Sequence, residues 1–236
     1  MKARLYLIPT PLGDHAPSSV LPTPVLERVC GLRRFFVEEL RTARRFLSAA
    51  GLKGRIDELE LYELNEHTTR EQIEGYAALL GEEDAGLISE AGLPAVADPG
   101  ALLVELAHRK GVEVVPMVGP SSLMLALMAS GLNGQCFAFT GYLPVKAPAR
   151  REAIVQLERT SARLGQSEII IETPYRNDAL LADLCATCKP ATRLCIAADI
   201  TCPDEFIRTM TVEAWGKEVK KGFAVGKRPC VFILYA

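Results

Sequence analysis

The sequence predicts an α/β protein with a mostly parallel sheet in its first half and a mixed sheet in its second half. In the first half, short apolar runs alternate with helical stripes about five times. This alternation is typical of a parallel sheet covered by helices on both faces. The second half has more strand-like runs and fewer helical ones, which favours a mixed sheet. The change in pattern falls near Pro116–Pro120.

The elements of the first half follow in order. Each strand-like run is short, apolar and followed by turn residues: Leu5–Ile8, Phe35–Val37, Leu59–Leu64, Gly86–Ser89 and Val112–Val115. Helical patterns follow these runs: Val25–Val29, Thr42–Ala50, the stripe Ile73, Ala77 and Leu80, the segment from Asp98 to Gly111, and Ser121–Ser130. Thr68-Thr69-Arg70-Glu71 fits a capping box. Asp98-Pro99-Gly100 predicts Asp98 as a helix N-cap.

The second half predicts five strands: Phe137–Thr140, Glu168–Ile171, Leu194–Ala198, Phe206–Met210 and Cys230–Tyr235. Helices are expected over Arg150–Leu164 and Asn177–Cys188, with a short segment around Trp215. Cys185 and Cys188 form a C-x-x-C, but they lie on the apolar stripe of the second of these helices. We therefore interpret them as buried small side chains rather than metal ligands, and predict no metal site.

Composition excludes some classes of protein. The net charge of −2 points neither toward nor away from nucleic acid. No run of about 18 apolar residues indicates a membrane span, and the N-terminal apolar run is too short for a signal peptide. We therefore expect a cytoplasmic protein with its seven cysteines reduced. Two basic clusters are interpreted either as solvated surface or as partner-binding sites: Arg33, Arg34, Arg41, Arg44, Arg45, and Lys217, Lys220, Lys221, Lys227, Arg228.

Three Gly/Pro loops carry the functional signal: Pro9–Gly13, Ser89–Gly100 and Pro116–Ser122. Each follows a predicted parallel strand, so all three should meet at the carboxyl edge of the sheet, where such sheets bind ligands. The second loop is longer than a plain connection requires. Ser121 and Ser122 begin a helix whose free N–H groups can hold an anion, with simple capping as the alternative. Neither a dinucleotide nor a P-loop motif is present. A cofactor with a carboxylate and an adenosine moiety would fit.

These motifs resemble one family in order and spacing. Leu5–Gly13, Ser89–Pro94 with Asp98–Gly100, Val114–Pro116 with Gly119–Ser121, and Gly141–Pro144 resemble the tetrapyrrole methylase superfamily. Within it, the sequence is most similar to RsmI-type ribosomal RNA small-subunit cytidine 2′-O-methyltransferases. Further matches are Glu38 with Arg41, Asn65-Glu66, Arg150-Arg151 and Glu172–Arg176.

The resemblance implies two α/β domains, which we divide at 1–117 and 118–236, with S-adenosylmethionine in the cleft between them. It also implies a homodimer that acts on RNA of the small ribosomal subunit. Carried over by position, the cofactor-binding residues would be Leu12, Gly92, Pro94, Val96, Ser121, Ser122, Tyr142, Thr173, Ala198 and Pro229.

The chain also departs from the family's pattern. Leu40, Glu90, Leu93 and Cys202 stand where relatives carry other residues, and many relatives have a further small domain beyond the position of Ala236. Three hypotheses therefore stay open. The chain is a ribose methyltransferase acting on RNA, a methyltransferase acting on a tetrapyrrole or other small molecule, or a non-catalytic paralogue that binds S-adenosylmethionine.

Methylation of a ribose hydroxyl needs a group that takes the hydroxyl proton. Glu38 and Glu66 are the candidate bases, and Arg41 and Asn65 are candidates for positioning phosphate or ribose. All four follow predicted strands at the cofactor edge. For Glu38 and Arg41, a surface ion pair at a helix start is the alternative.

Overall fold

The computed structural model describes residues 3–236, which fold into two compact units. The first unit ends at Ser121, and the second spans Ser122–Ala236. Each unit has its own sheet and its own apolar core. No helix within residues 3–236 is long and apolar enough to cross a lipid bilayer.

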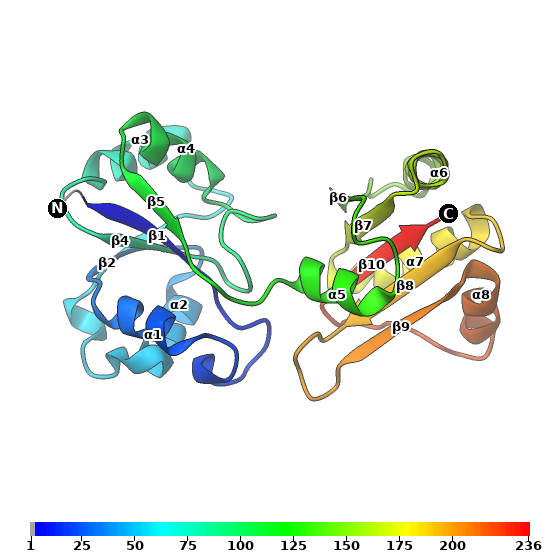
Figure 1. Ribbon diagram of the computed structural model, residues 1–236, viewed down its shortest axis with the longest axis horizontal. Helices are drawn as coiled ribbons and strands as arrows, with labels where there is room; N and C mark the ends of the chain where they lie inside the picture. The colour runs from blue at the N-terminus through cyan, green and yellow to red at the C-terminus, as the bar shows by residue number, and fades with distance from the viewer. Residues whose placement is uncertain (1–2) are drawn as a thin grey trace. The chain divides into compact units, whose positions relative to one another are not determined.

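The sheet of the first unit is fully parallel, as predicted (Figure 1). Its strands are β1 (Arg4–Ile8), β2 (Arg34–Val37), β3 (Glu60–Glu63), β4 (Ala85–Ile88) and β5 (Glu113–Pro116), in the spatial order β3-β2-β4-β1-β5. The central strands β2 and β4 are buried throughout because helices cover both faces of the sheet.

The helices of the first unit divide between the two faces of its sheet (Figure 1). On one face, α1 (Thr23–Cys30), α2 (Leu40–Leu47) and the one-turn η2 (Ser48–Leu52) pack through Val29, Leu47 and Leu52. On the other face, α3 (Arg70–Leu79) and α4 (Ala101–Arg109) pack through Ala77 and Leu103. Short turns η1 (Pro17–Ser19) and η3 (Ile56–Glu58) complete the unit.

The sheet of the second unit is mixed, also as predicted. Its strands are β6 (Phe137–Tyr142), β7 (Ser167–Ile171), β8 (Arg193–Ala198), β9 (Phe206–Thr211) and β10 (Cys230–Tyr235), in the order β6-β7-β10-β8-β9. Strands β6 and β7 are parallel, and every other neighbouring pair is antiparallel. The chain's one tryptophan, Trp215, is fully buried in this core and donates its indole N–H to the Leu194 carbonyl at 2.8 Å.

Four helices complete the second unit: α5 (Ser122–Ser130), α6 (Ala147–Leu164), α7 (Asn177–Thr187) and α8 (Val212–Lys220). A single turn, η4 (Pro174–Arg176), precedes α7. Cys188 is buried and Cys185 is half-buried against the core, in line with the interpretation of both as small apolar side chains. Within the described residues, no group of three or more potential ligands could hold a metal ion.

Two predicted helix starts are wrong in detail. The capping box of α3 is formed by Thr69 and Gln72, one residue later than predicted, because Thr68 turns back to accept the Asn65 N–H at 2.9 Å. At α4, the N-cap position belongs to Gly100, with φ of 117°, and not to Asp98. The Asp98 side chain is thereby free for another role.

Arg34 differs from the other members of its basic cluster. It is buried at the start of β2 and forms ion pairs with Glu60, Glu82 and Glu83 at 2.9–3.2 Å. Arg34 is therefore a structural residue and is not available to a partner.

Candidate functional site

The three Gly/Pro loops of the first unit meet at the carboxyl edge of its sheet, as predicted. Thr10 and Gly92 exchange two backbone hydrogen bonds, of 2.9 and 3.1 Å, which join the first loop to the second. The third loop packs against the first, since a Cβ added at Gly119 would overlap the ring of Pro9. The backbones of all three loops are therefore held at close approach.

Gly92 lies at the centre of this junction. Its φ of +78° is one that residues with a side chain rarely adopt, and an added Cβ would lie 3.2 Å from Leu12 Cδ2. The same Cβ would lie 3.7 Å from the Pro120 carbonyl oxygen. Leu12 and Gly92, both predicted to bind the cofactor, are thus neighbours.

The remaining predicted cofactor residues of the three Gly/Pro loops differ in exposure and in the unit to which they belong. Pro94 is buried and Val96 is 43% exposed. Ser121 ends the first unit, and Ser122 begins α5 of the second. Val96 lies between Ala95 and Ala97, whose φ values of 64° and 61° are uncommon for residues other than glycine. Such turns often mark functional loops.

The four predicted cofactor residues of the second unit share one edge of its sheet. Tyr142 ends β6, and Thr173 follows the parallel strand β7. Ala198 at the end of β8 pairs with Cys230, the first residue of β10, so Pro229 lies beside it. The Asp199 N–H donates to the Pro229 carbonyl at 3.0 Å. Tyr142 is exposed and Ala198 is fully buried.

The candidate base Glu38 lies directly at the loop junction. It follows β2, and its carboxylate accepts the backbone N–H of Glu90 at 2.9 Å. Burial raises the pKa of Glu38, and the charges of Glu90 and Glu66 raise it further, against the effect of that hydrogen bond. The structure thus brings Glu38 and Glu66 close enough to interact electrostatically.

Arg41 and Asn65 are less closely tied to this junction. Asn65 follows β3 and shapes the turn before α3, where its Oδ1 accepts the His67 N–H at 2.9 Å. Arg41 is exposed in the first turn of α2. The predicted alternative of an ion pair between Glu38 and Arg41 is not formed among the described residues. Glu39 instead caps α2 by accepting the N–H groups of Arg41 and Thr42.

Asp98 is a site residue that the sequence did not indicate. Burial raises its pKa to about 7, and the charges of Glu38 and Glu90 contribute to the shift. Asp98 and Glu38 therefore belong to one group of carboxylates at the carboxyl edge. A half-protonated acid near neutral pH is suited to accepting or holding a proton.

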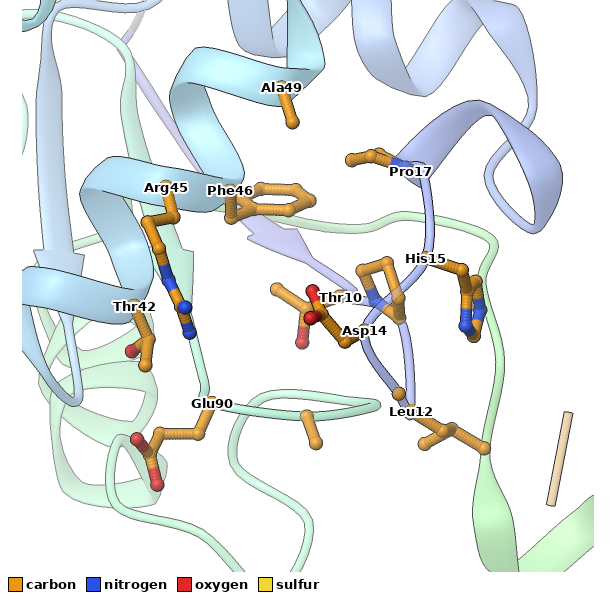
Figure 2. Close-up of a pocket in the computed structure, with 13 residues that line it drawn as sticks. Thr10, Leu12, Asp14, His15, Pro17, Thr42, Arg45, Phe46, Ala49 and Glu90 are labelled. Atoms are coloured by element: carbon orange, nitrogen blue, oxygen red, sulfur yellow. The ribbon is translucent and has the colours of Figure 1, made fainter. Parts of the chain in front are cut away.

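A pocket of about 410 Å³ is lined by Glu90, the residue whose backbone N–H donates to Glu38 (Figure 2). One wall is the segment from Thr10 to Pro17, and the facing wall is α2 with η2, through Thr42, Arg45, Phe46 and Ala49. Glu90 of the second loop lies below the pocket in Figure 2, and Ala91 of the same loop also lines it. The pocket combines an aromatic ring, a guanidinium and two carboxylates, from Asp14 and Glu90.

The protein is an α/β protein of two units, and its first unit has glycine-dependent loops and carboxylates at the carboxyl edge of a parallel sheet, the edge at which such sheets bind ligands. Residues 22–215 match the family described as Tetrapyrrole (Corrin/Porphyrin) Methylases. The chain belongs to this family.

Curated relatives carry the name Ribosomal RNA small subunit methyltransferase I. The protein of that name from Neisseria meningitidis serogroup B is 34% identical over 200 residues, which cover 84% of this chain and 64% of the relative. The one from Micromonospora olivasterospora is 36% identical, over 86% of this chain and 62% of its own length. The chain thus spans under two thirds of the length of these relatives.

Solved structures confirm the fold. Diphthine synthase superimposes with a TM-score of 0.71 at 16% identity, covering 99% of this chain and 90% of that one. Uroporphyrin-III C-methyl transferase from Thermus thermophilus, complexed with S-adenyl homocysteine, gives a TM-score of 0.56 at 16% identity, covering 99% and 97%.

Proposed function

We propose that this protein is an S-adenosylmethionine-dependent methyltransferase that methylates a ribose 2′-hydroxyl in small-subunit ribosomal RNA. One observation carries the proposal: the Glu38 carboxylate is hydrogen-bonded to the same loop that holds Gly92. A candidate base and a candidate cofactor loop therefore share one edge of the sheet. The named relatives support RNA of the small ribosomal subunit as the acceptor.

The residues at the loop junction fit the cofactor. Gly92 and Gly119 let the backbones of the three loops approach closely at the sheet edge, which is where sheets of this kind bind their ligands. Leu12, Pro94 and Val96 would supply apolar contacts, and Ser121 and Ser122 polar ones. Tyr142, Thr173, Ala198 and Pro229 are proposed as contacts from the second unit. When bound, S-adenosylmethionine would supply a methyl group on a positively charged sulfonium sulfur, which leaves as a neutral thioether when the carbon–sulfur bond breaks.

Glu38 is the proposed proton acceptor. A ribose hydroxyl gives up its proton as its oxygen attacks, and a carboxylate of raised pKa holds that proton better than an ordinary one. The Glu90 N–H fixes one Glu38 oxygen, so the other is free to face the hydroxyl. Glu66 raises the proton affinity of Glu38 through its charge, and Arg41 and Asn65 are proposed to position phosphate and ribose.

Methyl transfer from radiolabelled S-adenosylmethionine tests the proposal. Small ribosomal subunits from a strain that lacks the modification should incorporate label, and total small-molecule extract should not. Label in the extract alone would favour a tetrapyrrole or other small acceptor. Binding of the cofactor without transfer to either would favour a non-catalytic paralogue. We further propose a cytoplasmic homodimer, which light scattering coupled to gel filtration tests.

A further inference from the structure

Helix α2 and the turn η2 that continues it present a row of side chains to the pocket. Thr42, Arg45, Phe46 and Ala49 recur at helical spacing and line one wall. In Figure 2, the Phe46 ring projects from the helix toward the segment from Thr10 to Pro17, and the Arg45 side chain extends beside Thr42 toward Glu90. A flat apolar ring beside a planar cation is a combination that suits a nucleotide, with its base and its phosphate.

Outside α2, six of the seven described arginines of the first unit form ion pairs with carboxylates, and Arg33 forms none. The six are Arg4, Arg28, Arg34, Arg55, Arg70 and Arg109. Arg41, Arg44 and Arg45 form none with any residue in the described part of the chain. They are exposed, and Arg44 and Arg45 follow Arg41 by three and four residues, so each of them lies beside Arg41 on the helix surface. An exposed guanidinium without a carboxylate partner is able to neutralise a phosphate.

The pocket also contains two carboxylates, which are compatible with a bound nucleotide. Asp14 and Glu90 line the pocket near Arg45 without forming an ion pair with it (Figure 2). A carboxylate accepts hydrogen bonds from the exocyclic amino group of a nucleobase. The pocket also holds His15, whose Nε2 is buried and has no hydrogen-bond partner among residues 3–236. Polar groups thus surround the place where a base edge would lie.

We propose that this pocket binds one nucleotide of a single-stranded RNA segment, with its base stacked on Phe46 and its phosphate on Arg45. The inference rests on the proposed function and adds to it the place where the acceptor strand is held. Leu12 and Ala91 line the same pocket and belong to the loops proposed for the cofactor. A nucleotide in the pocket therefore lies next to the group that contains Glu38.

Two variants test the pocket. Phe46→Leu keeps an apolar side chain against the core but removes the flat ring, and Arg45→Gln removes the charge. Arg109→Gln is the matched control, since Arg109 is exposed on α4 and paired with Glu105. The probe is a fluorescein-labelled single-stranded oligoribonucleotide followed by anisotropy. Binding of S-adenosylmethionine by calorimetry and methyl transfer to small subunits are measured for the same proteins.

We expect Phe46→Leu to weaken RNA binding about tenfold, the effect of losing one base stack. Arg45→Gln should lower the slope of log K against log salt by about 0.7, the value for one phosphate contact on a single strand. Both variants should bind S-adenosylmethionine as the wild type does, and Arg109→Gln should match the wild type in every assay.

Two outcomes overturn the inference separately from the proposed function. In the first, the wild type methylates small subunits and both variants bind RNA normally. In the second, both variants lose cofactor binding and keep RNA binding, which assigns the pocket to the cofactor. If the wild type neither binds RNA nor methylates subunits, the proposed function and this inference fail together.

Discussion

The backbone N–H of Glu90 donates to the Glu38 carboxylate at 2.9 Å, although the two residues are 52 positions apart in the chain. The bond joins the end of β2 to the loop that follows β4. It also places the side chain of Glu38 against a loop whose own acidic residues, Glu90 and Asp98, repel its charge. Glu38 therefore has both a fixed orientation and a raised proton affinity.

Replacing Glu38 by glutamine separates its role as a hydrogen-bond acceptor from its proposed role as a proton acceptor. In Glu38→Gln, the amide oxygen still accepts the Glu90 N–H, but the side chain no longer takes a proton. We expect methyl transfer to fall by about 10²–10⁴-fold, the usual contribution of a general base. The thermal midpoint should not fall, because repulsion with Asp98 is relieved. Transfer assays and differential scanning fluorimetry measure the two effects.

Glu74→Gln is the control for that substitution. Glu74 is exposed on α3 and paired with Arg70 at 3.1 Å, an arrangement that contributes little to stability. It should transfer methyl groups at the wild-type rate. A Glu38→Gln enzyme with an unchanged rate would exclude Glu38 as the base and direct attention to Asp98.

Asp98 predicts a pH dependence of stability. Its pKa in the folded protein is raised to about 7, whereas an Asp in an unfolded chain titrates near about 4. The folded state therefore binds more protons than the unfolded state between these values, and stability falls as pH rises through this window. We expect Asp98→Asn to flatten the fall between about pH 4 and pH 7 and to raise the thermal midpoint at pH 8. Glu38, whose pKa is also raised, contributes with the same sign.

The exposed residue Asp57 provides a control for the pH series. Asp57→Asn should leave the wild-type dependence of the thermal midpoint on pH in place. If Asp98→Asn and the wild type show parallel curves from pH 4 to pH 8, Asp98 ionises normally in the folded protein and is not part of a coupled group with Glu38.

A buried ion pair in the second unit predicts unequal effects for two adjacent arginines. Arg150 is buried and bonded to Asp183 at 2.7 Å and to the Val145 carbonyl at 2.9 Å, whereas the Arg151 side chain is 57% exposed. We expect Arg150→Met to lower the free energy of unfolding by about 3 kcal/mol, since Asp183 loses its buried partner. Arg151→Met should cost less than about 1 kcal/mol. Urea titration followed by Trp215 fluorescence reports on this unit alone.

Equal losses for the two variants would contradict the burial argument. The test is which variant loses more unfolding free energy, not how large each loss is. Both arginines bond to the same carboxylate, so the contribution of Asp183 to the unfolding free energy cancels in the comparison. The loss of unfolding free energy in Asp183→Asn should be closer to the loss in Arg150→Met than to the loss in Arg151→Met.

The fold was predictable because its signals are local and repeated. Five apolar runs with helical stripes between them dictate a parallel sheet, and parallel strands end at one edge. The meeting of the three loops followed from that geometry. The capping box was shifted by one residue because Thr68 and Thr69 can both act as caps, and only the turn at Asn65 decides between them.

The carboxylate group around Glu38 was only partly predictable. Asp98 comes close to Glu38 through a loop in which Ala95 and Ala97 adopt positive φ. Alanine gives no sequence signal for that conformation, whereas glycine does. The sequence also could not show which arginines of the first basic cluster are paired with carboxylates. Arg34 and Arg45 look alike in sequence, but the glutamates that pair with Arg34 lie 26 to 49 positions further along the chain.

The contact between Gly119 and Pro9 provides a direct test of the loop junction. Gly119 has no left-handed φ, so its constraint is space alone, and an added Cβ would overlap the rigid ring of Pro9 and approach Leu21 at 3.1 Å. We expect Gly119→Ala to lower stability by about 1–3 kcal/mol, the usual cost of overpacking. It should also weaken S-adenosylmethionine binding, because the third loop must move away from the first.

Gly75→Ala is the control, because it replaces a glycine by alanine at a position where the added methyl group overlaps nothing. Gly75 lies inside α3, where an added Cβ meets nothing within 4 Å, so alanine should stabilise this helix by about 1 kcal/mol. Its affinity for the cofactor should equal that of the wild type. Calorimetry on both variants decides the point: if Gly119→Ala is destabilised but binds S-adenosylmethionine with wild-type affinity, the junction of the first and third loops supports the fold and does not shape the cofactor site.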